Sequence, residues 1–306
     1  MLISIIVCTY NRPDAIGNCL NSIHKSLEHS SQPEVEIVVV NNASTDHTAS
    51  ILEEWAKTCQ FPIKIVLEEK QGIAAARNCG IRAANGKLLV FIDDDCCMQE
   101  DHIENVANHY LKDKEPIFRG GRVELGDSSD LPLTIQTHKS IIRWHKTHKV
   151  RTHLGGGVIP GCNMIIPLDI IDEIGFFDEC MGAGAPIPAG EDSDFIIRAY
   201  LAGFLIEYVP DVVVKHFHGR KTIKEGVKLI RNYTLGSGAL YGKFLFTHPN
   251  LRIPTLYKKV PTINNSATAK RKDPLKEIKC SFWKKALYGL QGALMYYRYR
   301  NAKKRL

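Results

Sequence analysis

The regular alternation of short apolar runs with longer amphipathic segments limits most strongly what this chain can fold into. Each apolar run is rich in Val and Ile, and the runs lie at residues 3–8, 35–40, 63–67 and 88–92. The segments between them show helical spacing and cover residues 13–27, 45–59 and 72–84. Strands that are apolar on both faces belong to a parallel sheet covered by helices on both sides. The pattern predicts an α/β fold with right-handed crossovers.

The second half of the chain is less regular. Strands are expected at residues 117–125, 163–166, 205–209 and 212–215, and helices at 192–202 and 223–246. Residues 181–190 form a loop rich in Gly, Ala and Pro, which is typical of a ligand-facing loop but equally of a plain surface loop. We therefore predict a main α/β domain over residues 1–220 and a helical extension over residues 221–306.

Composition and charge restrict the class of protein further. The 306 residues are 44% hydrophobic and 24% charged, which excludes a disordered or collagen-like chain. The net charge of +7 is concentrated at one end, because residues 270–306 hold 12 Lys and Arg against 2 Asp and Glu. Nine scattered cysteines without a C-x-x-C pair indicate neither a zinc ribbon nor a disulfide scaffold, and they favour a reducing, cytoplasmic compartment.

Three consecutive carboxylates, Asp93, Asp94 and Asp95, follow the fourth apolar run. Adjacent carboxylates repel one another, and Mg²⁺ or Mn²⁺ supplies the compensating charge while taking oxygen ligands and substrate phosphates. On an extended segment alternate side chains share a side, so we expect Asp93 and Asp95 to approach one ion while Asp94 points aside. The alternative interpretation is a solvated acidic turn.

Polar residues also follow or precede the other expected strands. The carboxyl ends of parallel strands share one edge of a sheet, and ligands bind there. Residues 9–12 (T-Y-N-R) follow the first strand, residues 41–46 (N-N-A-S-T-D) follow the second, and Arg77 and Asn78 lie among small residues before the fourth. Amides and carboxylates can contact a base or ribose, and a fixed cation suits a diphosphate. Each segment alone is equally consistent with a helix cap or a packing face.

Five motifs, taken in order and spacing, resemble one known family. They are ISIIVCTYNR, VEIVVVNNASTD, GIAAARNCG, VFIDDD and GEDSDF, beginning at residues 3, 35, 72, 90 and 190. Over about residues 3–218 the chain resembles the family 2 nucleotide-sugar glycosyltransferases, which have the Rossmann-like GT-A fold. The resemblance implies an inverting, metal-dependent transfer of a sugar from a nucleotide diphosphate, a UDP-sugar by preference, to a glycan or lipid-linked acceptor in cell-surface polysaccharide or glycolipid synthesis.

The resemblance also assigns roles to residues. It makes residues 1–95 the nucleotide-binding half and residues 96–220 the acceptor and catalytic half. The donor-binding positions are Thr9, Asn11, Arg12, Asn42, Asp46, Arg77, Asp93 and Asp94. The resemblance assigns the binding of Mn²⁺ or Mg²⁺ to Asp93, Asp95 and His216, with His218 as the alternative imidazole. Asn42 departs from the family pattern, because many members carry an acidic residue near this position.

An attacking hydroxyl must lose its proton, which calls for a carboxylate within hydrogen-bond reach. The family position of this base is Asp192, with Glu191 beside it, at a helix start whose dipole favours the ionised form. Glu191 and Asp194 stay open as alternative bases, and all three residues could instead cap the helix. Asn163 falls in a segment that resembles the family's acceptor side, which makes it a candidate contact to the acceptor or donor sugar; an ordinary strand entry is the alternative.

Two other classes of protein are alternatives to a glycosyltransferase. The first strand-to-helix turn lacks G-x-G-x-x-G, which argues against an NAD-dependent oxidoreductase. A protein that binds a nucleotide sugar or a glycan without turnover remains the alternative function.

The basic C-terminal segment has a distinct pattern. Residues 280–306 interleave aromatic and aliphatic side chains with Lys and Arg, as an interfacial helix on an anionic membrane does. No apolar stretch approaches the roughly 20 residues of a membrane span. We expect peripheral association with the cytoplasmic face of a membrane through this segment and no nucleic-acid partner. Packing on the body or a homodimer contact are the alternatives.

Overall fold

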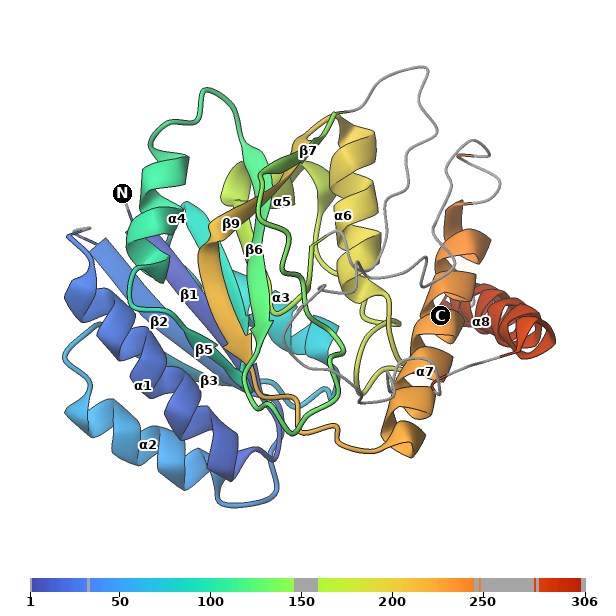
Figure 1. Ribbon diagram of the computed structural model, residues 1–306, viewed down its shortest axis with the longest axis horizontal. Helices are drawn as coiled ribbons and strands as arrows, with labels where there is room; N and C mark the ends of the chain where they lie inside the picture. Colours follow the sequence, from blue (N-terminus) through green and yellow to red (C-terminus); the bar gives the residue numbers. More distant parts are fainter. Residues whose placement is uncertain are drawn as a thin grey trace, which may run out of the picture.

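The computed structural model describes residues 2–31, 34–145, 159–244, 248, 278 and 281–303. Within these residues one nine-stranded sheet is flanked by helices (Figure 1). The strands are β1 Leu2–Thr9, β2 Glu34–Asn41, β3 Ile63–Leu67, β4 Leu88–Asp93, β5 Cys96–Met98, β6 Ile117–Leu125, β7 Ile142–Trp144, β8 Asn163–Pro167 and β9 Leu205–His216. The helices are α1 Pro13–His29, α2 Thr48–Thr58, α3 Ile73–Ala83, α4 His102–Tyr110, α5 Leu168–Ile174, α6 Glu191–Ala202, α7 Ile223–Phe244 and α8 Phe282–Lys303.

The sheet is mixed and mostly parallel, as the sequence predicts. Its order is β3-β2-β1-β4-β8-β6-β9-β5, and β7 pairs with β9. Strands β1 to β4 are parallel neighbours, β8 is antiparallel to both β4 and β6, and β6 is parallel to β9. Because β8 reverses the direction and β6 restores it, the carboxyl ends of β1, β2, β4 and β9 all reach the same edge.

Alternate residues of the strands fill two cores, one on each face of the sheet. Ile3, Ile5 and Val7 of β1 pack with α1, α2 and α4, whereas Ile6 and Cys8 pack with α3, α5 and α6. Strands that are buried on both faces need continuous apolar runs, which explains why β1, β2 and β4 could be predicted from the sequence. Strand β3 lies at the edge of the sheet and is only partly buried. Figure 1 shows the two layers of helices around the sheet.

Several predicted elements differ from the structure. The two strands expected at residues 205–209 and 212–215 are one continuous strand, β9. The pairing of β9 with β6 shifts its register between Gly121 and Arg122 of β6, which accommodates the residues between the two expected strands. Helix α2 begins at Thr48 rather than at residue 45, and the Asp46 side chain accepts a hydrogen bond from the N–H of this first residue. The last two residues of the helix expected at 223–246 lie outside the described residues. Strand β5 and helices α4 and α5 had no predicted counterpart.

Helix α8 packs directly on the backbone of α7. A Cβ added at Gly238 would overlap the Gly289 carbonyl oxygen, and one at Gly292 would overlap that of Leu235. The two helices therefore approach so closely that only hydrogen fits at these positions. A Cβ at Gly289 would meet nothing within 4 Å, although this glycine lies one turn from Gly292.

This difference between two glycines of one helix gives a test of the α7–α8 contact. Gly292→Ala should destabilise the chain by about 1–3 kcal/mol, because the methyl group overpacks the contact. Gly289→Ala should be neutral or stabilising by up to about 1 kcal/mol through helix propensity. Chemical unfolding and the rate of proteolysis within α8 measure both effects. Equal behaviour of the two variants would contradict the packing.

Candidate active site

A buried arginine joins four segments at the carboxyl edge of the sheet. Arg77 of α3 is 3% exposed. Its Nη2 donates to Asp93 Oδ1 at the end of β4 and to the Gly161 carbonyl oxygen, both at 3.1 Å. Its Nη1 donates to Glu191 Oε1, also at 3.1 Å. The guanidinium therefore holds the acidic cluster after β4 against the acidic start of α6.

The carboxylates at the start of α6 lie beside this arginine. Asp192 Oδ1 accepts a hydrogen bond from the Ser193 N–H at 2.6 Å, and a Cβ at Gly161 would approach Asp192 Oδ2 to 3.1 Å. Burial raises the pKa of Glu191 to about 7, the negative charge of Asp192 adds to the rise, and Arg77 opposes it. Burial also raises the pKa of Asp192. Glu191 and Asp192 therefore bind a proton more readily than exposed carboxylates do, as a general base requires.

Asp194 is the third acidic residue of the same turn, and the structure separates it from the other two. Its side chain is fully buried, and it forms ion pairs with Arg198 at 2.9 Å and with Lys243 at 2.7 Å. Lys243 of α7 also reaches Asp178 at 2.7 Å. Asp194 thus connects α6 to α7, which leaves Asp192 and Glu191 as the carboxylates that face Arg77.

A second pair of ionisable groups lies where β4 and β9 end. Asp95 Oδ1 is 3.2 Å from His216 Nε2, and Asp95 Oδ2 is 3.7 Å from Arg12 Nη2. Burial alone would raise the pKa of Asp95, but the contact with His216 and the charge of Arg12 lower it below its usual value. Asp95 therefore stays ionised in a place that favours a cation.

The acidic cluster is a turn rather than a continued strand. Strand β4 ends at Asp93, and Asp94 and Asp95 belong to the turn that follows, so the expected alternation along an extended segment is wrong. Asp94 is buried, and burial together with the charge of Asp95 raises its pKa to about 7. The side chain of Asp93 is 34% exposed. Asp93 and Asp95 approach the edge from different sides, through Arg77 and His216.

The remaining predicted donor positions gather at the ends of β1 and β2. Thr9 ends β1, and Asn11 has a φ of 50° and receives a hydrogen bond from Thr45. Asp46 accepts from the Thr48 N–H at 2.9 Å. The side chain of Asn42 is fully bonded to backbone, since it donates to the Glu68 and Lys70 carbonyls and accepts from the Gly72 N–H. Asn42 therefore fixes the approach to α3.

Two residues singled out from the sequence, His218 and Asn163, form hydrogen bonds within the fold. His218 Nε2 is 3.0 Å from the Leu131 carbonyl oxygen, whereas His216 Nε2 faces Asp95. Asn163 has no exposed surface, and its amide contacts His102 and the carbonyls of Arg122 and Val212. These bonds favour the second interpretation of Asn163, an ordinary strand entry at the start of β8.

Sequence reasoning missed the residues that hold the Gly-rich loop 181–190 and the segment before it. Asn78 binds the Phe177 backbone and Glu179, and the Ile73 N–H donates to the Ala183 carbonyl oxygen. The Ile73 bond fastens the Gly-rich segment 181–190 to the start of α3, and Asn78 fastens the residues just before that segment to the same helix. The only signal in the sequence was the neighbourhood of Arg77 and Asn78 among small residues.

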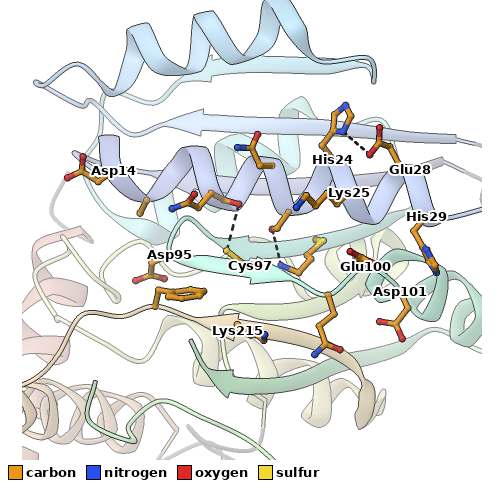
Figure 2. Close-up of a pocket in the computed structure, with 17 residues that line it drawn as sticks. Asp14, His24, Lys25, Glu28, His29, Asp95, Cys97, Glu100, Asp101 and Lys215 are labelled. Atoms are coloured by element: carbon orange, nitrogen blue, oxygen red, sulfur yellow. Dashed lines mark hydrogen bonds and ion pairs between the residues drawn. The ribbon is translucent and has the colours of Figure 1, made fainter. Parts of the chain in front are cut away.

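A pocket of about 1220 Å³ lies beside this edge rather than over it. Residues of α1, including Asp14 and Lys25, form one wall, while Cys97 and Lys215 come from β5 and β9 (Figure 2). Of the predicted site residues, Asp95 alone is in its lining. The pocket therefore lies on the α1 face of the sheet, whereas Arg77 and Glu191 belong to the α3 and α6 face.

The mixed sheet and its acidic carboxyl edge define the GT-A class of glycosyltransferase folds. Residues 4–175, more than half of the chain, match the family model described as Glycosyl transferase family 2. The chain therefore belongs to this family.

Curated relatives carry glycosyltransferase names. The chain is 36% identical over 139 residues to "Putative glycosyltransferase EpsH" of Bacillus subtilis, which is 44% of this chain and 39% of that protein. It is 26% identical over 223 residues to "Glycosyltransferase AglE" of Haloferax volcanii, covering 70% of this chain and 66% of that one. The chain thus spans less than two thirds of the length of either relative.

Solved structures share the fold. Staphylococcus aureus TarS 1–349 in complex with UDP-GlcNAc has a TM-score of 0.55 at 22% identity, over 78% of this chain and 66% of that one. The mannosyltransferase PcManGT of Pyrobaculum calidifontis in complex with GDP-Man and Mn²⁺ has a TM-score of 0.59 at 20% identity, over 96% of this chain and 72% of that one. At these sequence identities the likeness shows a shared fold and nothing more.

The raised pKa of Glu191 predicts a pH dependence of stability. The folded chain holds this proton up to about pH 7, whereas the unfolded chain releases it near 4.5, so raising the pH between these values favours unfolding. Glu191→Gln should flatten this fall in the free energy of unfolding. Chemical unfolding in the presence of a chelator measures it from pH 4.5 to 7.5.

The control for this prediction is Glu53→Gln, which removes an exposed carboxylate of α2. It should keep the pH slope of the unmodified chain. Parallel slopes for Glu191→Gln and the unmodified chain would show that Glu191 does not hold the proton.

Proposed function

We propose that this chain transfers a sugar from a nucleotide diphosphate donor to a hydroxyl acceptor, with inversion at the sugar. The observation that carries the proposal is the shared position of Asp93 and Glu191 on one buried cation, Arg77. It sets the acidic cluster after β4, which suits a metal and a diphosphate, against the start of α6, which suits a general base. Both halves of the chemistry then lie at one edge.

The donor side is formed by the ends of β1, β2 and β4. Thr9, Asn11, Arg12, Asn42, Asp46 and Asp94 supply or support the nucleotide contacts in this proposal, and the half-exposed side chain of Arg12 is the cation best placed to reach a diphosphate. We propose a UDP-sugar as the donor. TarS with UDP-GlcNAc supports this choice, while PcManGT with GDP-Man makes a guanine nucleotide the rival.

In this proposal Asp93, Asp95 and His216 hold a divalent cation. Asp95 and His216 are already in contact, whereas Asp93 lies on the Arg77 side of the edge. Two carboxylates and an imidazole are ligands that Mn²⁺ accepts, and Mg²⁺ accepts the carboxylates together with phosphate oxygens. The position of Asp95 beside His216, with its pKa lowered, supports this donor set. A bound ion there would neutralise charge on the departing diphosphate. The residues of the chain hold and orient the donor for the attack.

Asp192 is the proposed base. The acceptor hydroxyl approaches the anomeric carbon from the side opposite the diphosphate, and Asp192 Oδ2 accepts the proton of that hydroxyl as the new C–O bond forms. The Ser193 N–H fixes the other oxygen, Oδ1, at 2.6 Å. Glu191, held by Arg77, keeps the start of α6 in place beside it.

Asp192→Asn tests the base. The amide cannot take a proton, so transfer should fall by about 10²- to 10⁴-fold. Donor binding should persist, measured as Mn²⁺-dependent thermal stabilisation by a panel of UDP- and GDP-sugars, since a bound ligand raises apparent stability. Undiminished transfer by this variant would remove Asp192 from the base role.

Two companion variants separate the roles. Asp95→Asn should lose the Mn²⁺-dependent stabilisation, because it removes a proposed metal ligand. Asp172→Asn changes an exposed carboxylate of α5 and should keep both binding and transfer. Binding of donor by the unmodified chain with no turnover in any acceptor mixture would favour the rival function, a nucleotide-sugar-binding protein.

We propose further that α8 lies on the cytoplasmic face of an anionic membrane. Trp283, Leu287, Leu290, Leu294 and Tyr297 are each 49–80% exposed, and their spacing of four and three residues places them on one side of α8. Residues 281–303 contain five Lys and Arg and no acidic residue, so the charge complements anionic headgroups. No helix among the described residues is long and apolar enough to cross a membrane. A lipid-linked glycan acceptor suits this position.

Vesicle binding tests this surface. The full chain should bind vesicles with a large fraction of phosphatidylglycerol and lose affinity in pure phosphatidylcholine and at high salt. Leu287→Ala combined with Leu290→Ala should weaken binding at least about tenfold, because buried aliphatic carbon contributes about 0.8 kcal/mol per methylene. Co-sedimentation with the vesicles measures it.

The control changes an exposed apolar residue elsewhere. Val227→Ala on α7, 41% exposed, should leave vesicle binding unchanged. If the double variant instead binds vesicles normally and loses self-association in sedimentation velocity, the exposed face of α8 is a contact between two copies of the chain.

A further inference from the structure

Three buried side chains with soft or borderline ligand atoms meet beneath the acidic edge. Strands β5 and β9 are antiparallel, and Cys96 lies directly opposite His216. Side chains in such a pair share a face and lie close together. Cys162, immediately before β8, completes the group. One ligand atom from each residue lies within 4.8 Å of the other two, and the three residues are 0%, 4% and 7% exposed.

A carboxylate stands at the open side of this group. Asp95 Oδ1 is 3.2 Å from His216 Nε2 and 4.0 Å from Cys96 Sγ. His216 Nδ1 faces Thr134, at 3.2 Å from Oγ1 and 3.4 Å from the carbonyl oxygen, so Nε2 is the atom turned toward Asp95. A hydrogen-bond partner on one ring nitrogen, here Thr134 on Nδ1, holds an imidazole in position so that the other nitrogen can bind a metal.

We propose that Cys96, Cys162, His216 and Asp95 form a binding site for a thiophilic divalent cation, of which Zn²⁺ is the representative. Zn²⁺ takes four ligands in a tetrahedron, with bonds of about 2.0 Å to N and O and 2.3 Å to S, so ligand atoms lie about 3.3–3.8 Å apart. The ligand atoms of Cys96, Cys162 and His216 lie within 4.8 Å of one another, so they have to move together by at most about 1.5 Å to reach that geometry. Binding exchanges the two thiol protons, which pass to the buffer, for the ion.

The chemistry distinguishes this site from the one proposed for Mn²⁺ or Mg²⁺. Those ions prefer oxygen ligands and gain little from two thiolates, whereas Zn²⁺ and Cd²⁺ favour sulfur. Asp95 and His216 belong to both ligand sets, so one ion excludes the other. Zn²⁺ would therefore inhibit transfer by withdrawing these two residues from the donor-binding ion. This effect on transfer rests on the proposed function, whereas the binding of the ion does not.

Metal titration of the full chain tests the site. The chain is stripped of metal, kept reduced with a phosphine and titrated with Cd²⁺, whose bonds to thiolates give an ultraviolet charge-transfer band. The band should saturate at one equivalent and be displaced by Zn²⁺. Cys96→Ala and Cys162→Ala should each remove it and weaken Zn²⁺ binding by more than about 100-fold, the upper end of the loss caused by an outer-shell change.

The matched control is Cys97→Ala. Cys97 is the next residue of β5, pairs with Lys215 and lines the pocket beside α1 (Figure 2). It should keep the band and the Zn²⁺ affinity. A band that survives in both Cys96→Ala and Cys162→Ala, or that disappears in Cys97→Ala, would overturn the site.

X-ray absorption by the Zn²⁺-loaded, unmodified chain needs no variant. It should show two sulfur and two nitrogen or oxygen neighbours, and a shell with no sulfur or with four sulfurs would contradict the assignment. In transfer assays at saturating Mn²⁺, Zn²⁺ should inhibit the unmodified chain and spare Cys162→Ala. If no transfer is found at all, the band and the absorption spectrum still decide the metal site.

Discussion

The burial of one guanidinium among carboxylates is the constraint on which the rest of the site depends. Arg77 has almost no exposed surface, and it binds Asp93, Glu191 and the Gly161 carbonyl at the same distance. Removing one partner of a buried ion pair leaves an uncompensated charge and costs about 3–5 kcal/mol. The end of β4, the start of α6 and the segment before β8 are therefore held together by electrostatics as well as by the apolar core.

This arrangement divides the acidic edge into two parts with different chemistry. On one part Asp95 lies beside His216 and is kept ionised, which suits a metal and a diphosphate. On the other part Glu191 and Asp192 have raised pKa values because they are buried, which suits proton transfer. Opposite shifts in neighbouring carboxylates are what separate an electrostatic role from an acid–base role. Asp93, bound to Arg77, lies between the two parts.

Local patterns made part of this visible in the sequence. Buried parallel strands need continuous apolar runs, so β1, β2 and β4 were predicted, and the carboxylates after β4 could be placed at the ligand edge. The partly buried edge strand β3 was predicted from a shorter run of the same kind. Three-residue β5 is too short to leave a periodic signal, yet it brings Cys96 opposite His216. Ion pairs between residues far apart in the chain, such as Lys243 with Asp194, follow from packing that no local pattern records.

The ion pair between Lys243 and Asp194 also connects the proposed membrane surface to the proposed catalytic base. Helix α8, the proposed membrane surface, packs on α7 through glycines that allow backbone contact. Lys243 then joins α7 to Asp178 and to Asp194, two residues beyond the proposed base. Because each step is a close-packed or buried contact, the orientation of α8 on a bilayer would fix that of the first turn of α6. The basic charge of the C-terminal segment would thus set the orientation of the acidic edge relative to the bilayer, in addition to attracting the chain to the membrane.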